Sequence, residues 1–446
     1  MKFANLALIT LTLALAACSS GTQFPEPTGK GTFRGLNAIS TSPSINFRLE
    51  EVTGQRILSM NYRDITAPTR FDDFEYNFNF EVRFAGELLD TRVATVTQKI
   101  DANRDYTFVA TGAVENPTIL TWIGDERVFE AEETVAEVRL AHLAESVGPV
   151  DFYFAPTGTT PVLGEADGTL SFGEILPAQD VEAGNYELIV TAPGDPTTIL
   201  YQSIAVTYAT RTAAIVAIFD GTTDDAAPIT GNVLVTIGGS SFAINDPRFP
   251  STLSFIQASR SLETVDIYGD ELLTNQVVGA LPYTGTSNEI SVGDGEQPYF
   301  FTPAGTTGAV VFETTVVPGG GRRYEHYSIG ETGSLLGVSG VRNTQPVSIY
   351  PTLAVTNMLP SAQIADVYVV EPGESIDDIV PRFSAIYGFI SGRLPLVAGT
   401  YDVIITADDS KVPLGTQQIT ISNGDVVRFT LFETADPNVI EILPQP

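Results

Sequence analysis

The sequence predicts an all-β protein made of four tandem antiparallel β-sandwich modules, and three observations lead to this prediction. The 446 residues include 39 Gly and 28 Pro, with 43% hydrophobic residues, a mixture that favours strands separated by turns over helices. Apolar and polar residues alternate in many short runs, whereas the one candidate helix, residues 375–387, is interrupted by Pro381. A short strand also recurs at intervals of roughly one small domain, as tandem modules require.

The recurring strand has the pattern Val-Asp-x-Tyr. Copies with this pattern or close to it lie at residues 150–153, 265–268 and 365–368, and a degraded copy lies at residues 44–47. In the degraded copy Asn46 stands in place of the Asp. A second strand, Ala-Gly-x-Tyr, follows in two of the copies, with Gly184 before Tyr186 and Gly399 before Tyr401. Four copies predict four modules, of which the first is the most divergent.

Module boundaries are expected where the apolar alternation lapses. The predicted modules are residues 30–129, 134–245, 250–344 and 351–443. Modules of about 100 residues with roughly seven short strands are typical of immunoglobulin-like sandwiches. Each sheet is expected to bury one face and expose the other to water. Residues 74–84 show this pattern most clearly, because every even position in that run is apolar.

The N-terminus has the features of an export signal. Lys2 precedes an apolar run at residues 6–15, which is shorter than the roughly 20 residues of a membrane-spanning helix. The sequence Leu-Ala-Ala-Cys that ends at Cys18 resembles the lipobox of bacterial lipoproteins, in which the Cys is acylated and becomes the first residue. The resemblance implies a lipoprotein signal peptide at residues 1–17 and lipidation of Cys18, followed by a flexible tether at residues 18–29. The alternative is an ordinary secretory signal with a chance Cys.

The lipobox resemblance also implies a location. Ser19 follows Cys18 where inner-membrane lipoproteins carry an Asp, so we expect an outer-membrane lipoprotein, facing either the periplasm or the exterior. Cys18 is the only cysteine, and therefore no internal disulfide is expected. The formal net charge is −31, from 23 basic and 54 acidic residues, and such a surface repels nucleic acid.

The repeated strands resemble a known bacterial family, the domain of unknown function 4397, whose modules often occur in tandem in exported proteins. The resemblance implies a β-sandwich fold, and it implies no particular activity because the role of the family is not established. It is good in modules 2 and 4, fair in module 3 and weak in module 1. The residues that carry it are Arg139, His142, Ser146, Val150, Asp151 and Tyr153, with Gly184, Tyr186, Gly399 and Tyr401.

Residues for catalysis are sparse. The chain has two histidines, His142 and His326, in different predicted modules, and it lacks both a Gly-x-Ser-x-Gly elbow and zinc-ligand spacings. We therefore expect a protein that is not an enzyme and has no catalytic residue, no metal site and no cofactor. Four Asp doublets are expected to be solvated turn residues, or else to line weak cation sites. These doublets lie at residues 72–73, 224–225, 377–378 and 408–409.

The Asp of the recurring strand has two interpretations. In the structural one, Asp151, Asp266 and Asp366 accept backbone N–H groups and fix the turn before their strand, because an unpaired buried carboxylate is costly. In the functional one, each module carries one ligand site at this Asp. Tyr153, Tyr268 and Tyr368 stand two residues later on the same strands.

Taken together, these features predict a lipid-anchored envelope protein that extends four modules away from the membrane as a non-catalytic scaffold, spacer or adhesion-type binding surface. Its expected partners are the membrane, through the anchor, and an envelope protein or glycan. The alternative is a carbohydrate- or polymer-binding component of an envelope uptake system. An enzyme remains a third class, which a deep pocket with paired carboxylates of shifted pKa would favour.

Overall fold

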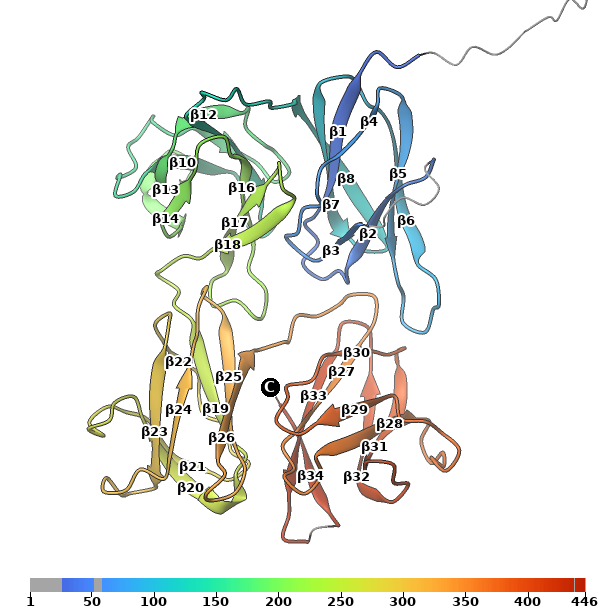
Figure 1. The fold of residues 1–446 in the computed structure, drawn as a ribbon, viewed down its shortest axis with the longest axis vertical. Coiled ribbons are helices and arrows are strands. Elements are labelled where there is room, and N and C mark those ends of the chain that lie inside the picture. The colour runs from blue at the N-terminus through green and yellow to red at the C-terminus, as the bar shows by residue number, and fades with distance from the viewer. Residues whose placement is uncertain (1–25, 52–57, 437, 446) are drawn as a thin grey trace, which may run out of the picture.

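Four β-sandwiches occupy the corners of a two-by-two arrangement in the computed structural model (Figure 1). The structure describes residues 26–51, 58–436 and 438–445. Modules 1 to 4 contain strands β1–β8, β9–β18, β19–β26 and β27–β34, which span residues 30–125, 135–244, 252–341 and 352–444. The last strand ends one residue beyond the predicted limit at 443. No helix in the described ranges has the length and apolar character needed to cross a membrane.

The elements have the following bounds. Module 1 contains β1 (Lys30–Asn37), β2 (Ile45–Leu49), β3 (Leu58–Met60), β4 (Thr69–Asp72), β5 (Glu75–Val82), β6 (Thr91–Lys99), β7 (Arg104–Ala113) and β8 (Asn116–Asp125). Module 2 contains β9 (Val135–Leu143), β10 (Val150–Pro156), β11 (Gly168–Leu170), β12 (Gln179–Glu182), β13 (Gly184–Ala192), β14 (Asp195–Gln202), β15 (Val206–Tyr208), β16 (Ala213–Asp220), β17 (Ile229–Val235) and β18 (Ser240–Ile244).

Module 3 contains β19 (Thr252–Gln257), the short 3-10 helix η1 (Arg260–Leu262), β20 (Thr264–Tyr268), β21 (Gln276–Pro282), β22 (Ile290–Ser291), β23 (Gln297–Pro303), β24 (Phe312–Val316), β25 (Arg323–Ile329) and β26 (Leu336–Val341). Module 4 contains β27 (Thr352–Asn357), β28 (Ile364–Val370), β29 (Phe383–Ile386), β30 (Leu394–Pro395), β31 (Gly399–Ala407), β32 (Pro413–Ile421), β33 (Val426–Glu433) and β34 (Ile440–Pro444).

The four modules share one topology. Module 1 has the sheets β4-β1-β7-β8 and β3-β2-β5-β6, modules 3 and 4 repeat this order, and module 2 adds β15 and β18. The first strand of each module runs parallel to the first strand of the closing hairpin: β1 with β7, β9 with β16, β19 with β25 and β27 with β33. The prediction of tandem, mainly antiparallel β-sandwiches is therefore confirmed, and only the expected number of about seven strands in each module is too low. Every module has at least eight strands and one parallel pair.

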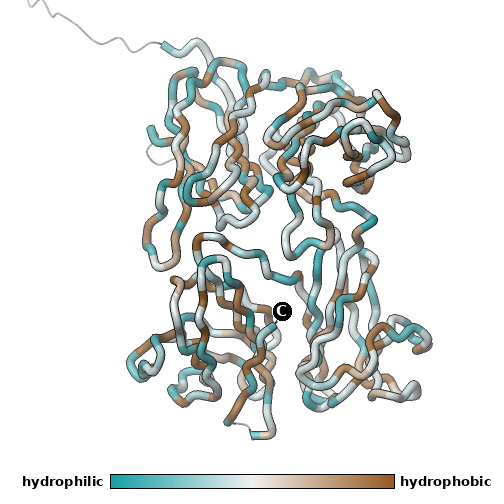
Figure 2. Tube along the Cα trace, turned by 180° about the vertical axis from the view of Figure 1, so that it is seen from behind, coloured by the Kyte–Doolittle hydropathy of each residue, from teal (hydrophilic) through white to brown (hydrophobic). Residues whose placement is uncertain are grey.

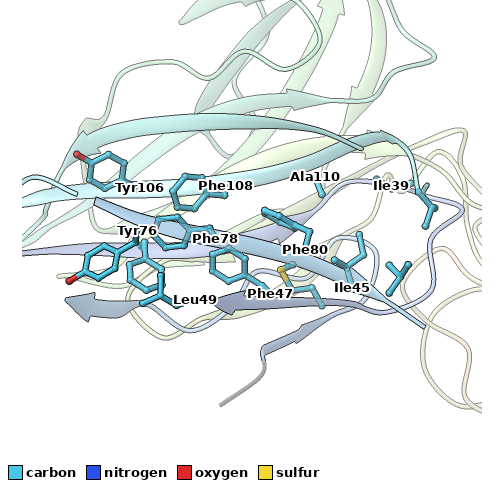
Figure 3. Packing of buried hydrophobic residues seen from close by; sticks show 14 of the residues in the cluster. Ile39, Ile45, Phe47, Leu49, Tyr76, Phe78, Phe80, Tyr106, Phe108 and Ala110 are labelled. Atoms are coloured by element: carbon cyan, nitrogen blue, oxygen red, sulfur yellow. The ribbon is translucent and has the colours of Figure 1, made fainter. Parts of the chain in front are cut away.

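Aromatic side chains from both sheets fill the core of module 1 (Figure 3). The ring centroids of Phe78 and Phe108 lie 4.4 Å apart across the sandwich, and those of Phe33 and Phe78 lie 4.8 Å apart. The even positions of the 74–84 run face this core, as their alternation predicts. Two polar residues at odd positions, Asn79 and Glu81, are also buried, and each has a partner. Glu81 pairs with Arg48 at 2.6 Å, and Asn79 accepts a hydrogen bond from Thr95.

The central strands of one sheet in each module are buried on both faces, unlike the one wet face that alternation predicts. In module 2, seven consecutive residues of β16, 213–219, are buried. The reason is that this sheet packs against the β4-β1-β7-β8 sheet of module 1, with Leu36 and Trp122 against Leu143 and Phe219. Modules 3 and 4 pack in the same way. Unbroken apolar runs are typical of strands that are buried on both sides.

The two pairs of modules close into a ring. The linker from module 3 to module 4 runs along module 1, where Val347, Ile349 and Tyr350 join its hydrophobic core. The Ser348 N–H donates to the Thr41 carbonyl at 2.9 Å. Figure 2 shows the same closed arrangement from behind. The sequence does not predict the geometry between the modules, and the structure shows a closed ring, in which apolar residues of the linker to the last module pack against the first.

Candidate functional site

The carboxylates of the recurring strand link neighbouring strands within each module. Asp151 accepts hydrogen bonds from the Thr169 hydroxyl and the Gly194 N–H, and Asp266 accepts them from the N–H groups of Ala280 and Gly305. Both Asp side chains are buried.

Asp366 repeats the arrangement in module 4. It accepts from the Ser384 hydroxyl at 2.6 Å and from the Asp409 N–H at 3.2 Å. Gly194, Gly305 and Asp409 all have a positive φ, and each lies in the turn that follows the fifth strand of its module, namely β13, β23 or β31. The carboxylate therefore bonds this hairpin turn, and the expectation that it fixes the turn before its own strand is wrong.

Module 1 makes the corresponding bond with donor and acceptor exchanged. The Asn46 side-chain amide donates to Asp90 at 2.7 Å, and Asp90 lies in the β5–β6 hairpin. In module 1 the carboxylate is therefore on the turn and the amide is on the strand, and the hydrogen bond between strand and turn is present although the strand has no Asp.

We expect Asp366→Ala to lower the free energy of unfolding by about 1–3 kcal/mol, because the Ser384 hydroxyl and the Asp409 N–H would lose the buried carboxylate that accepts their hydrogen bonds. Thermal or urea denaturation measures this loss. Asp377→Ala is the matched control, since Asp377 is exposed and bonded to Ser375. If Asp366→Asn instead left stability unchanged and abolished a binding activity, a ligand role for this Asp would be favoured.

The tyrosines of the recurring strand do not form one site, because each lies in its own module. The Tyr153 hydroxyl donates to the Val162 carbonyl at 3.3 Å, Tyr268 is buried, and the Lys411 ammonium lies 4.6 Å from the Tyr368 ring centroid.

A second set of tyrosines explains the Ala-Gly-x-Tyr pattern. Tyr186 and Tyr401 each donate to the carbonyl four residues earlier, at 3.0 Å and 2.9 Å, and Tyr76 does the same in module 1. A Cβ on Gly399 would lie 3.3 Å from the Tyr401 hydroxyl oxygen. The glycine therefore gives the ring room to fold back over the strand.

The two histidines are buried in separate modules. His142 lies 3.0 Å from the Gly148 carbonyl, and burial lowers the pKa of its imidazole. His326 lies 2.7 Å from the Ser339 hydroxyl, and burial lowers its pKa to about 3. Each ring therefore packs as a neutral side chain near neutral pH. In the described part of the chain, no group of three or more His, Cys, Asp or Glu residues is arranged to hold a metal ion.

The acidic doublet at residues 224–225 is neither a solvated turn nor a cation site in the structure, which corrects both expectations. Asp225 pairs with Arg63 of module 1 at 2.8 Å and with Arg322 of module 3 at 3.3 Å. Burial raises the pKa of the Asp225 carboxyl, but Arg63 outweighs this effect, so the pKa lies below its ordinary value. Asp224 accepts from the N–H of Thr344 in the linker to module 4, at 2.7 Å. The doublet therefore joins three modules and the linker near the centre of the ring.

A cavity with charged walls lies between modules 1 and 2 and has a volume of about 870 Å³. Strands β7 and β8 of module 1 form one wall, and β9 with residues 175–178 of module 2 forms the other. Its lining includes Arg104, Arg127 and Arg139, together with Trp122. Sequence reasoning noted Arg139 only as part of the repeated pattern and missed the other three. The one sequence signal for this cavity is the charged residue Arg139, which lies inside the alternating strand of residues 137–143.

A family model matches part of the chain that forms this cavity. Residues 31–153 match a family model described as Domain of unknown function (DUF4397). The match covers module 1, where the recurring strand is most degraded, and continues through β9 into the first part of β10 of module 2, including Arg139 and Asp151. No protein of curated function matches the chain.

Among solved structures, the chain is similar to the Bacillus anthracis TIE protein at 12% sequence identity, with a TM-score of 0.15. The alignment covers 87% of this chain and 66% of that one. The chain thus spans slightly less than two thirds of the length of this neighbour.

Proposed function

We propose that the protein is a lipid-anchored, non-catalytic body of the cell envelope that acts as a scaffold or binding surface. One observation carries the non-catalytic part of this proposal: the side chains that the sequence offers for chemistry are engaged inside separate modules. His142 and His326 are buried, and Asp151, Asp266 and Asp366 hold hairpin turns. Because the four modules form a closed ring, we favour a compact scaffold over a long spacer.

The proposed anchor rests on the lipobox resemblance at Cys18, which lies outside the described residues. The described chain begins at Glu26 and continues into β1, which it enters at the end of module 1 that points away from modules 3 and 4 (Figure 1). The twelve residues from Ser19 to Lys30 span at most about 40 Å when extended. Anchoring at Cys18 would therefore hold module 1 close to the bilayer, with its outer end facing the lipid.

We expect Cys18→Ala to move the protein from the outer-membrane fraction to the soluble fraction, because stable anchoring depends on the acyl chains. Cell fractionation with metabolic palmitate labelling measures both the location and the modification. Ser20→Ala is the matched control and should remain labelled and in the membrane. Retention of the Cys18→Ala protein in the membrane fraction, without label, would contradict the anchor.

A second candidate function is binding of a carbohydrate or polymer, and the cavity between modules 1 and 2 favours it. Aromatic stacking does not explain such binding, because the aromatic run at residues 74–84 faces the core of module 1. Among the described residues, the exposed phenylalanines are Phe242 and Phe389, which belong to different modules and are 45% and 65% exposed. Polar and charged groups in the cavity would have to supply the recognition.

A further inference from the structure

We propose that the cleft between modules 1 and 2 binds a small hydroxylated organic acid with a single carboxylate, such as a uronic acid, and that Arg139 is its anion-binding residue. The proposal deepens the second candidate function by naming a site and a ligand class. It does not depend on the lipid anchor.

The cleft is built on fixed walls. The indole N–H of Trp122, which lines the cleft, donates to the Gly173 carbonyl of module 2 at 2.9 Å, and Trp122 belongs to the apolar contact between the modules. The volume of about 870 Å³ lies within the range of about 300–1,000 Å³ that small-molecule sites occupy. Because both walls are strands of packed sheets, the cleft is preformed.

Arg139 reaches across this cleft from β9. Its Nε donates to the Leu176 carbonyl at 3.3 Å, which orients the guanidinium. A Cβ on Gly124 of β8 would lie only 3.2 Å from Nη1 of Arg139. Gly124 has no positive φ, so the glycine at this position provides space for the guanidinium rather than an unusual backbone conformation.

Arg139 differs from its neighbours in lacking a carboxylate. Within the cleft, Arg104 pairs with Asp125, and Arg127 lies 3.7 Å from Glu137 and 3.2 Å from Asp180. No carboxylate of the described residues lies within 4.0 Å of Arg139, although Asp105 and Glu137 are near enough to act on it over longer distances. Burial lowers the pKa of this guanidinium, because a desolvated cation without a partner is costly. A ligand carboxylate that accepts two N–H groups from the planar fork would remove that cost.

Two further polar atoms of the lining lack a hydrogen-bond partner among the described residues. They are Oδ1 of Asp105 and Nε of Arg127, and both are buried. Asp105 holds Arg34 through its other oxygen, at 2.7 Å. Both atoms have almost no accessible surface, and Nε of Arg127 faces Glu137 at 3.7 Å, so neither contacts a ligand directly. Asp125 of the lining supplies an accessible acceptor for ligand hydroxyl groups, because its side chain is 88% exposed and pairs with Arg104 through one oxygen.

The charge of the lining favours a monoanion over phosphate. Asp105, Asp125, Glu126 and Glu137 all line the cleft, and like charges disfavour a dianion in a partly desolvated space. Phosphate near neutral pH carries more negative charge than one carboxylate and has fewer hydroxyl groups to offer the exposed carboxylate of Asp125. The cleft therefore selects a carboxylate with neutral hydroxyl groups.

Trp122, the only tryptophan of the chain, reports on this site directly. We expect galacturonate to cause a saturable change in the Trp122 fluorescence of the purified full-length protein, with one site per chain by calorimetry and a dissociation constant of about 1 mM or below. Neutral galactose and inorganic phosphate should each bind at least tenfold more weakly. Arg139→Gln should weaken galacturonate binding at least tenfold, and Arg139→Lys, which keeps the charge without the fork, should lie between the two.

Arg83→Gln is the matched control, since Arg83 is an exposed arginine of module 1 that pairs with Asp90, and it should leave binding unchanged. Gly124→Ala provides a second variant that keeps Arg139 and should also weaken binding by crowding the guanidinium. The proposal would be overturned by no saturable signal up to about 10 mM galacturonate, by equal binding of galactose, by tighter binding of phosphate, or by full affinity in the Arg139→Gln protein. None of these results bears on the Cys18 test, so the two proposals fail separately.

Discussion

Glu325→Ala is expected to lower the free energy of unfolding by about 3–5 kcal/mol, the usual loss when one partner of a buried ion pair is removed. Glu325 of β25 and Arg428 of β33 form a bidentate pair across the contact between modules 3 and 4, and their side chains are only 5% and 7% exposed. The Tyr327 hydroxyl also donates to Glu325, at 3.2 Å, and Arg342 lies 3.8 Å away. The substitution removes the carboxylate around which these groups are arranged.

Urea denaturation, with hydrogen exchange to locate the change, measures the effect of Glu325→Ala. The exchange rates should rise in β25 and β33 before other strands. Glu313→Ala is the matched control, because Glu313 is exposed on β24 of the same module and should change stability by less than about 0.5 kcal/mol. The double variant Glu325→Leu with Arg428→Met should recover most of the loss, since apolar replacements of a buried pair are often neutral. A loss below about 1 kcal/mol for Glu325→Ala would show that the pair contributes little.

Ile349→Ala is expected to destabilise module 1 by about 2–5 kcal/mol, the range for truncating a buried Ile to Ala. Ile349 belongs by sequence to the linker between modules 3 and 4, yet it is buried in the core of module 1 with Val347 and Tyr350. The substitution therefore opens a cavity in a module that is distant in sequence. Hydrogen exchange should rise first in β2 and β5.

A matched control separates this effect from general damage. Val412→Ala removes part of an aliphatic side chain that is 71% exposed in module 4, and it should leave the exchange of module 1 unchanged. If Ile349→Ala destabilised module 4 alone and left β2 and β5 protected, the linker would not close module 1.

Alternation and turn residues were sufficient to predict a β-sandwich array, because both are local properties of the chain. The alternating run at residues 74–84 correctly indicated one wall of a core. Ring closure could not be predicted, since it depends on contacts such as that of Ser348 with Thr41, between segments that are far apart in sequence. One local signal did exist: residues 213–219 are apolar without alternation, which is the pattern of a strand covered on both faces.

The candidate sites show the same limit. The recurrence of Asp151, Asp266 and Asp366 indicated a shared role, but the turn that each one bonds was visible only in three dimensions. The doublet at residues 224–225 resembled any acidic turn, because its partners Arg63 and Arg322 come from two other modules. Arg139 could not be recognised as lacking a carboxylate partner, since that property depends on the spatial position of every acidic residue around it.

The position of the linker in the ring has a consequence for the order in which the protein is made. Module 1 is synthesised first, and domains generally fold in that order as the chain emerges. Its core nevertheless lacks Val347, Ile349 and Tyr350 until modules 2 and 3 and the linker have followed. Module 1 therefore emerges with part of its core uncovered, and the linker residues cover that part once they have been synthesised.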